Sequence, residues 1–531
     1  MSAEQTSKLH RAFREIGFWT GFSRILGFAR DLAFAQFLGA GPAADAFLVA
    51  FKLPNLFRRL TAEGAMTNAF LPVFSQIRAQ KGREAALMLA AEVQIWLLLV
   101  LSLIVVLAEF FMPLVIGLLA PGFQHTPARF EAAVQLARIT MPYLPMISLV
   151  ALWAAITNAH DRFFGGAVAP VILNVMLITG ALAIPLVQTA DLPANWQGPQ
   201  MLALPVALSV LAAGVGQMLL MQAKLAPISA RPRWRLPMVS QAGRQMWRNF
   251  LPAALGAGGL QLNLLVDMIL ASFLPVGAVS WLYYSDRVAQ LPLGIIGIAL
   301  GTALLPRLSK LEAENQQAAV PVELANGLRL AGFFGLPAAC AIFILAEDII
   351  GGLFGRGAFR AEDVAAASVA LMAYGVGIPA FVATKILQPA FYASGQPGTV
   401  LKISLSSVAF NVLASIGLMQ LLRPYGLGHM GLALATSGAA WLVLGLQTIL
   451  LLRQKRVDNT AFSALIKPCL ASLVMGLFLI GLQMGLGPYL LPMLGGFLWL
   501  CVISLIGLIC YFICAFYLGI LPASLFRPSK S

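Results

Sequence analysis

Charged side chains are scarce in this sequence. Asp, Glu, Lys and Arg together make up 11% of the 531 residues, whereas hydrophobic residues make up 60%. Soluble domains carry about 25% charged residues, so this composition excludes a string of soluble domains. Apolar runs recur from end to end, and about 20 such residues suffice for one helical span. The sequence therefore predicts an all-α integral membrane protein.

Acidic residues are scarcer than basic ones: 21 Asp and Glu stand against 35 Lys and Arg, which gives a net charge of +14. A charge of this sign could indicate nucleic-acid binding, but the basic residues form no continuous phosphate-binding stripe. They gather in short loops between apolar runs, mainly 78–83, 224–235 and 453–456. This positive-inside pattern argues against a nucleic-acid partner and predicts that both termini are cytoplasmic.

Reactive motifs are missing as well. The five cysteines all lie in apolar stretches without metal-ligand spacing, and the four histidines are dispersed. The sequence contains no phosphate-binding loop and no nucleophile–base constellation. We therefore expect no enzyme activity, no metal and no cofactor. Residues 1–16 are polar, and the apolar run after them contains arginines, so we expect a retained first span rather than a cleaved signal peptide.

Fourteen apolar segments are separated by turn or charged residues, and we interpret each as a membrane span. The second segment would be about 50 Å long as a straight helix. We therefore expect it to tilt, protrude or break, with Pro54 and Pro72 as the break points. The segments cover residues 14–38, 44–77, 86–120, 129–158, 164–188, 200–226, 245–273, 277–308, 320–354, 364–393, 399–423, 427–453, 462–486 and 491–520.

An internal repeat relates the two halves of the chain. Pro142 recurs as Pro379, and Asn174 recurs as Asn411, at the same spacing in the sequence. Six spans in each half mean that the halves enter the membrane in the same sense, as a parallel repeat of two six-helix lobes. We expect an N-lobe over 1–226, a cytoplasmic linker over 227–244, a C-lobe over 245–456, and two C-terminal helices with a cytoplasmic tail over 457–531.

Arginines inside the first, second and eighth spans are the strongest functional signal. An arginine or aspartate at the bilayer centre costs about 2.5–3.5 kcal/mol, whereas a leucine returns only about 0.5 kcal/mol. We expect these side chains to face a water-filled cavity, where guanidinium groups can bind phosphate oxygens in pairs. Cations from both halves favour a diphosphate or another polyanionic head group. The candidate head-group residues are Arg24, Arg30, Asp31, Asp45, Arg58, Arg59, Glu63 and Arg287.

The alternative for these charges is purely structural ion pairing inside the membrane. It would join Arg24 or Arg30 to Asp31, Arg58 to Glu63, and Asp286 to Arg287. We favour a functional role because the arginines outnumber their plausible buried partners.

A second candidate site would bind a cation. Asp267 is an isolated carboxylate within an apolar span, and Asn411 and Thr436 offer oxygen ligands from two later spans. A lone membrane carboxylate suggests a Na⁺ or H⁺ site. The alternative is a protonated, hydrogen-bonded packing residue.

Three stretches of sequence carry a resemblance: Phe22-Ser-Arg-Ile-Leu-Gly-Phe-Ala-Arg-Asp31, Val49-Ala-Phe-Lys-Leu-Pro-Asn-Leu-Phe-Arg-Arg59 and Ser280-Trp-Leu-Tyr-Tyr-Ser-Asp-Arg287. They resemble the MurJ (MviN) family, the lipid II flippases of bacterial peptidoglycan synthesis, and the resemblance covers essentially the whole chain. It departs at Gln290 and Ser415, where some family members carry acids. The resemblance implies the multidrug/oligosaccharidyl-lipid/polysaccharide exporter fold, with a central cationic cavity and two C-terminal helices bordering a groove for the polyprenyl tail.

The resemblance also implies a function and assigns roles. Its essential cavity arginines fall on Arg24, Arg30, Arg58 and Arg287, with acidic companions at Asp31, Asp45 and Glu63. We expect alternating-access transfer of lipid II across the bacterial inner membrane, coupled to Na⁺, H⁺ or the membrane potential. The expected partners are lipid II, membrane lipids and the cell-wall synthesis machinery.

Two other functions remain open. The first is a flippase for another prenyl-diphosphate-linked glycan, for which the same arginine logic holds. The second is an ion-coupled small-molecule exporter of the same fold, which predicts acids rather than arginines as the main cavity charges.

Overall fold

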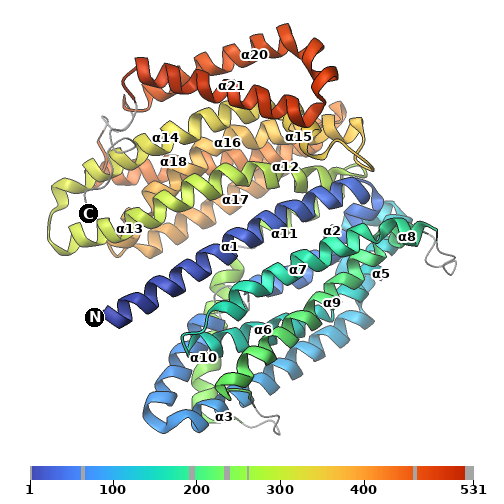
Figure 1. Ribbon diagram of the computed structural model, residues 1–531, viewed down its shortest axis with the longest axis vertical. Helices are drawn as coiled ribbons and strands as arrows, with labels where there is room; N and C mark the ends of the chain where they lie inside the picture. Colours follow the sequence, from blue (N-terminus) through green and yellow to red (C-terminus); the bar gives the residue numbers. More distant parts are fainter. Residues whose placement is uncertain are drawn as a thin grey trace. The chain divides into compact units, whose positions relative to one another are not determined.

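The chain folds almost entirely into α-helices in the computed structural model (Figure 1). The structure describes residues 3–60, 66–189, 198–232, 239–259, 262–458 and 463–520, and no strand occurs within these ranges. Helices are expected because a backbone in hydrocarbon must satisfy its hydrogen bonds within its own segment. The predicted all-α class is confirmed.

Residues Met1–Ser280 and Gly357–Phe359 form one compact unit. Its helices are α1 (Ala3–Phe37), α2 (Pro42–Leu60), α3 (Met66–Phe110), α4 (Met112–Leu119), η2 (Pro121–His125), α5 (Pro127–Thr140), α6 (Tyr143–Asn158), α7 (Phe164–Leu182), α8 (Ile184–Gln188), α9 (Pro199–Leu225), η4 (Ala226–Ile228), α10 (Gln241–Gly259) and α11 (Leu262–Ser272). Within this unit α7 packs on α1 and α9, and α5 packs on α2. The first helix is thus fixed to the unit chiefly through α7.

The second unit comprises Trp281–Arg356 and Arg360–Ser531. Its helices are α12 (Ala278–Pro292, which begins in the first unit), the π-helical turn η5 (Leu293–Gly297), α13 (Ile298–Ala313), η6 (Gln317–Ala319), α14 (Val320–Ile344), α15 (Ala346–Phe354), α16 (Ala361–Ala393), α17 (Pro397–Leu422), η7 (Arg423–Tyr425), α18 (Gly428–Arg453), α20 (Ile466–Leu494) and α21 (Gly496–Tyr517). The last two helices form a hairpin beside α14 and α15 (Figure 1).

Ten stretches of the described chain are long and apolar enough to span a membrane. They coincide with the third to sixth and the ninth to fourteenth predicted spans. The other four predicted spans correspond to α1, α2, α10–α11 and α12–α13, which are shorter or carry more charge. These four include every described helix that carries a predicted head-group residue. The predicted head-group residues therefore lie on helices that are shorter or more charged than the ten apolar stretches.

The two units repeat the same helix pairings. In the first unit α6 packs on α3 and α9, and α7 packs on α9. In the second, α16 packs on α14 and α18, and α17 packs on α18. Short helices, α4 and α15, follow α3 and α14 in equivalent places. These matched pairings support the internal repeat seen in the sequence.

The two compact units do not divide at the predicted linker. Helix α10 begins at Gln241, inside the predicted linker, and packs on α3, while α11 packs on α4 and η2, all within the first unit. The start of α10 is held by Glu92 of α3, whose Oε1 accepts the backbone N–H of Ser240 at 2.9 Å. The division of the chain into lobes over 1–226 and 245–456 therefore stays a prediction.

The expected break points of the second span were wrong. Pro54 and Pro72 lie inside α2 and α3 rather than at helix ends. Proline persists in membrane helices because neighbouring groups can satisfy the freed carbonyls. Helix α2 ends at Leu60, inside the predicted span, and the backbone of α3 departs from helical geometry at Gly82, where φ is +83°, a conformation that favours glycine. Gly82 lies within the loop that we predicted to be cytoplasmic.

Candidate functional site

Arg30 of α1 is held in a buried hydrogen-bonded fork. Its Nε and Nη2 donate to Oδ1 of Asp31 at 3.0 and 2.7 Å, and its Nη1 donates to Oδ1 of Asn174 at 3.0 Å. The Arg30 and Asp31 side chains are 13% and 3% exposed. Of the structural pairings left open by the sequence, the pair of Arg30 with Asp31 is therefore formed.

Asn174, on α7, also hydrogen-bonds to the backbone of α1. Its Nδ2 donates to the carbonyl oxygen of Ser23 at 3.0 Å. A Cβ at Gly27 would lie 3.6 Å from the same Nδ2, an ordinary van der Waals distance, so the two helices are in contact here. The sequence marked Asn174 only as a repeat position, and its long-range pairing with Arg30 was missed.

Arg24 lies on another face of the same helix. Its side chain is exposed, in contrast to the half-buried Arg30 one and a half turns later. An exposed guanidinium in the middle of a predicted span fits a water-filled surface better than hydrocarbon, because the charge would cost several kcal/mol in lipid. Helix α1 thus carries Arg24 on an exposed face and Arg30 in a pair with a carboxylate.

Asp45, near the start of α2, is fully buried. Its Oδ1 accepts the backbone N–H of Ser280 at 3.0 Å and the Ser280 hydroxyl at 2.7 Å. Its Oδ2 accepts the backbone N–H of Gly277 at 2.8 Å. Asp45 therefore caps the start of α12 from a different helix, where the positive end of the helix dipole favours an anion.

Arg129 is the buried cation beside Asp45. It is 2% exposed, and its Nη1 donates to Oδ2 of Asp45 at 3.2 Å. Its Nη2 donates to the carbonyl oxygen of Ser272 at 3.1 Å, and its guanidinium carbon lies 3.9 Å from the centroid of the Phe123 ring. The sequence analysis did not name Arg129 among the candidate residues. The cluster joins α2, α5, η2 and the segment between α11 and α12.

In the second unit, Arg287 stacks over an aromatic ring of its own helix. Its guanidinium carbon lies 5.0 Å from the centroid of the Tyr283 ring. The neighbouring Asp286 accepts a hydrogen bond from Nε2 of Gln290. A cation–π contact leaves the in-plane N–H groups of a guanidinium directed outward. The contact with Tyr283 thus orients the Arg287 guanidinium, whose N–H groups suit an anion.

Lys385 is a membrane cation that the sequence analysis overlooked. It is an exposed residue of α16 between buried neighbours, and its side chain lies beside Gly297 of the π-helical turn. The signal was present in the sequence, because a lysine within an apolar span carries an energetic penalty similar to that of an arginine.

Three predicted head-group residues cannot be placed. Glu63 lies outside the described residues, and so do the side chains of Arg58 and Arg59, whose backbone belongs to α2.

The three members of the candidate cation site belong to different units. Asp267 is a half-buried residue of α11 in the first unit. In the second unit Nδ2 of Asn411 donates to Oγ1 of Thr436 at 3.2 Å, and Ser415 donates to Oδ1 of Asn411 at 3.4 Å. Asn411 and Thr436 thus come together between α17 and α18, and a joint site with Asp267 stays a prediction.

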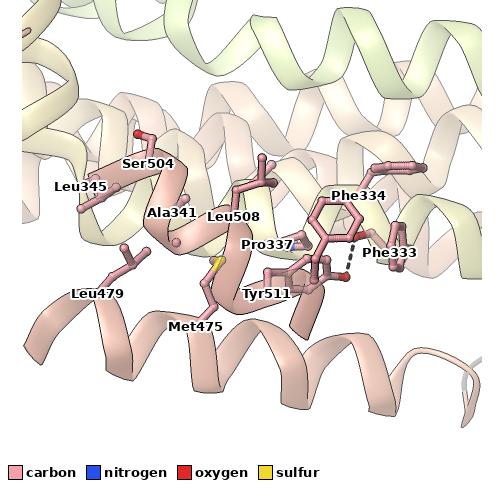
Figure 2. A pocket seen from close by; sticks show the side chains of 13 residues that line it. Phe333, Phe334, Pro337, Ala341, Leu345, Met475, Leu479, Ser504, Leu508 and Tyr511 are labelled. Atoms are coloured by element: carbon pink, nitrogen blue, oxygen red, sulfur yellow. Dashed lines mark hydrogen bonds between the residues drawn. The ribbon is translucent and has the colours of Figure 1, made fainter. Parts of the chain in front are cut away.

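An apolar cavity of about 200 Å³ lies between α14 and the hairpin of α20 and α21 (Figure 2). Tyr511 closes part of one wall by donating its hydroxyl to the carbonyl oxygen of Phe333 at 2.6 Å. Leu508, Phe512 and Phe334 line the cavity and are 53%, 38% and 36% exposed, so its rim reaches the outer surface of the unit. Such a cavity suits a hydrocarbon chain.

His160 follows the last turn of α6, outside the apolar spans. Burial lowers the pKa of its imidazole below the usual value, and the nearby cations Arg78, Arg83 and Arg162 lower it further. The hydrogen bond from its Nδ1 to the carbonyl oxygen of Ile156, 2.8 Å long, acts in the opposite direction. Burial and the neighbouring cations thus disfavour the protonated imidazole.

Comparisons with known proteins give this architecture a family. A family model described as "Lipid II flippase MurJ" matches residues 34–503. The chain belongs to the MurJ family. It is 37% identical to the "Probable lipid II flippase MurJ" of Rhizobium tropici over 82% of this chain and 79% of that protein. It is 34% identical to the "Probable lipid II flippase MurJ" of Vibrio cholerae over 80% of each chain.

Solved structures agree with the MurJ assignment. A structure titled "Lipid II flippase MurJ, inward closed conformation" matches with a TM-score of 0.74 and 25% identity, over 96% of this chain and 99% of that one. An inward-facing multidrug resistance MATE transporter of the MOP superfamily matches with a TM-score of 0.62 at 14% identity, over 82% and 96% of the two chains, which shows a shared fold. This chain is thus a multi-pass membrane protein with the helical architecture of MurJ transporters.

Proposed function

We propose that this chain moves lipid II from the cytoplasmic to the periplasmic leaflet of the bacterial inner membrane by alternating access, for cell-wall synthesis. The observation that carries the proposal is membership of the MurJ family along nearly the whole chain. The arginines of α1 and α12 support it, because they lie in the least apolar predicted spans and suit a diphosphate.

The proposed head-group site is built from cations of both halves. Arg24 and Arg30 from α1, Arg287 from α12 and Lys385 from α16 would neutralise the diphosphate, whose transfer through hydrocarbon as a bare anion is prohibitive. Arg30 would exchange Asp31 for a phosphate oxygen while Asn174 keeps its position. Arg58, Arg59 and Glu63 belong to the same proposal on the basis of the sequence alone.

The Asp45 cluster is proposed as the outer gate of the transport cycle. If the N-terminus is cytoplasmic, the turn between α1 and α2 and the turn before α12 both lie on the periplasmic side. The bonds from Asp45 to Gly277 and Ser280 tie these two ends together. Release of the head group to the outside would require this buried cluster to open.

The prenyl tail is proposed to occupy the apolar cavity beside α20 and α21. The cavity lining is almost wholly apolar and its rim is exposed on the outside of the unit. A tail held there could follow its head group without leaving a hydrophobic environment.

The energy source is proposed to include the membrane potential. A negative interior favours the return of an empty cationic cavity to the inward-facing state. Coupling to Na⁺ or H⁺ would use Asp267 and the polar pair of Asn411 and Thr436. Contact with the cell-wall synthesis machinery belongs to the same proposal.

Depletion of the protein in its native bacterium tests the proposal, with leaflet accessibility of lipid II as the readout. We expect lipid II to accumulate on the inner leaflet while its synthesis continues. Normal arrival of lipid II at the outer leaflet, in cells without a second flippase, would contradict the proposal. If another prenyl-linked glycan accumulates inside while lipid II does not, the substrate is that glycan.

A further inference from the structure

Within the second unit, a carboxylate of α15 contacts the hairpin of α20 and α21. Asp348 lies in the first turn of α15. Its Oδ1 accepts the indole N–H of Trp499 at 2.9 Å, and its Oδ2 accepts a hydrogen bond from Nε2 of Gln483. One side chain therefore binds both helices of the hairpin, Gln483 on α20 and Trp499 on α21.

The attachment is rigid and mostly buried. Trp499 is 1% exposed, so its N–H group would lack any partner without Asp348. Beside it, α15 and α21 meet through two glycines: a Cβ at Gly352 would lie 2.9 Å from the carbonyl oxygen of Gly496. A hydrogen bond to a carboxylate in such a setting is stronger than one between neutral groups. These contacts fix the distance between α15 and the start of α21.

The same attachment lies next to the apolar cavity. Leu345 lines the cavity three residues before Asp348, and Leu479 lines it four residues before Gln483. Three or four residues are one helical turn, or about 5 Å. The cavity therefore begins one turn away from the carboxylate, between α14 and the hairpin (Figure 2).

The rest of the hairpin is held by apolar packing and by hydrogen bonds between neutral groups. Beyond apolar packing, it is joined to α14 by the hydroxyl of Tyr511, which binds the carbonyl oxygen of Phe333, and by Sγ of Cys340, which lies 3.2 Å from the carbonyl oxygen of Ser472. Neither involves an ionised group. Among these polar contacts, the hydrogen bonds to the Asp348 carboxylate are the strongest kind, because a hydrogen bond to a charged group is stronger than one between neutral groups.

We propose that Asp348 is a positioning residue for the prenyl tail of the substrate. By holding Gln483 and Trp499 together, it keeps the hairpin at the spacing from α14 that admits the tail. This inference rests on the proposed function, in which the cavity beside the hairpin takes the tail. It predicts that loss of the carboxylate weakens recognition of the tail and spares recognition of the head group.

The test compares two lipid II probes with the same head group, one with a long prenyl tail and one with a short tail. Binding of each to the purified full-length chain gives a tail preference, the ratio of the two Kd values. We expect Asp348→Ala to lower affinity for the long-tailed probe about tenfold, or about 1.4 kcal/mol, and to change the short-tailed Kd less than about twofold on the same scale. Glu347→Gln changes an exposed acid of the same turn and should keep the wild-type ratio.

Two milder variants guard against a fold defect in Asp348→Ala. Gln483→Leu and Trp499→Phe each remove one donor and leave the carboxylate in place, and each should lower the tail preference about threefold, half of the full effect in free energy. A wild-type tail preference in Asp348→Ala, or in both milder variants, would overturn the positioning role.

A fifth variant tests the tail site independently of the positioning role of Asp348. Ala338→Phe fills the cavity from α14 and leaves Asp348 untouched. Loss of tail preference in Ala338→Phe but not in Asp348→Ala would leave the tail site standing and refute the positioning role. A wild-type protein without tail preference, or an Ala338→Phe variant that keeps it, would refute the tail site itself.

Discussion

Removal of the Asp45 carboxylate is the substitution expected to damage the first unit most. Asp45→Leu would leave the Arg129 guanidinium buried without its carboxylate, and would leave the N–H groups of Gly277 and Ser280 without their acceptor. Breaking one side of a buried ion pair costs about 3–5 kcal/mol. At about 2–4 °C per kcal/mol for a domain of some 200 residues, the melting temperature should fall by about 6 °C or more.

The companion variant separates charge from packing. In the double variant Asp45→Leu with Arg129→Leu, both charges are gone, and replacing a buried pair by apolar residues is often neutral. We therefore expect the double variant to melt above Asp45→Leu, so that the two changes are strongly non-additive. Glu131→Gln, an exposed acid on the same helix as Arg129, is the matched control and should melt like the wild type.

Thermal unfolding in detergent, followed by intrinsic fluorescence, measures these differences. The outer-gate proposal adds a second readout, because a weakened cluster should increase labelling of periplasmic-side cysteine reporters. If Asp45→Leu melts within about 1 °C of the wild type, far below the shift expected for a broken buried pair, the ion pair does not hold the cluster together. Additive effects in the double variant would lead to the same conclusion.

Three further predictions follow from single contacts. Asn174→Leu removes a hydrogen-bond acceptor from Arg30, and a hydrogen bond to a charged group contributes about 1.5–3 kcal/mol. We therefore expect the rate of flipping to fall about tenfold in a complementation assay. An unchanged rate would exclude the contact from function. Gly243→Ala places a Cβ 1.9 Å from Oε1 of Glu92, so the melting temperature and the activity should fall. Adding Glu92→Asp, which shortens that side chain, should restore part of both. A wild-type melting curve for Gly243→Ala would refute the expected clash. Because the pKa of His160 is lowered, the folded state binds fewer protons than the unfolded state. The free energy of unfolding should therefore decline as the pH falls through about 6.5. An equal decline in the His160→Gln variant would contradict a role of His160.

The spans and the repeat were predictable because they depend on local composition. A helix in hydrocarbon needs only its own residues to form its hydrogen bonds, so apolar runs marked the helices well. The repeat followed from single residues such as Asn174 and Asn411, which occupy matching places on α7 and α17. The misjudged prolines show the limit of a local rule, because packing decides whether Pro54 ends a helix.

The partners of the charged residues were not predictable from the sequence. Arg30 and Asp31 are adjacent, and their pairing was among the stated alternatives. Arg129 meets Asp45 across 84 positions, and Arg30 meets Asn174 across 144. No periodicity or spacing encodes such contacts, because they arise only when helices from distant parts of the chain pack together. The energetic cost of a charge in the membrane indicates which helices carry function. The packing of the helices then decides which of their charges are already paired.

The most direct test of the account measures lipid II at the outer leaflet of cells in which this chain is the sole flippase. Wild type should be compared with Arg24→Ala, Arg287→Ala and, as an exposed control in the turn η7 at the end of α17, Arg423→Ala. At equal protein levels, the account predicts that lipid II stays on the inner leaflet with either of the first two variants and reaches the outer leaflet normally with Arg423→Ala. Normal outer-leaflet lipid II with both Arg24→Ala and Arg287→Ala would contradict a cationic cavity that carries the diphosphate.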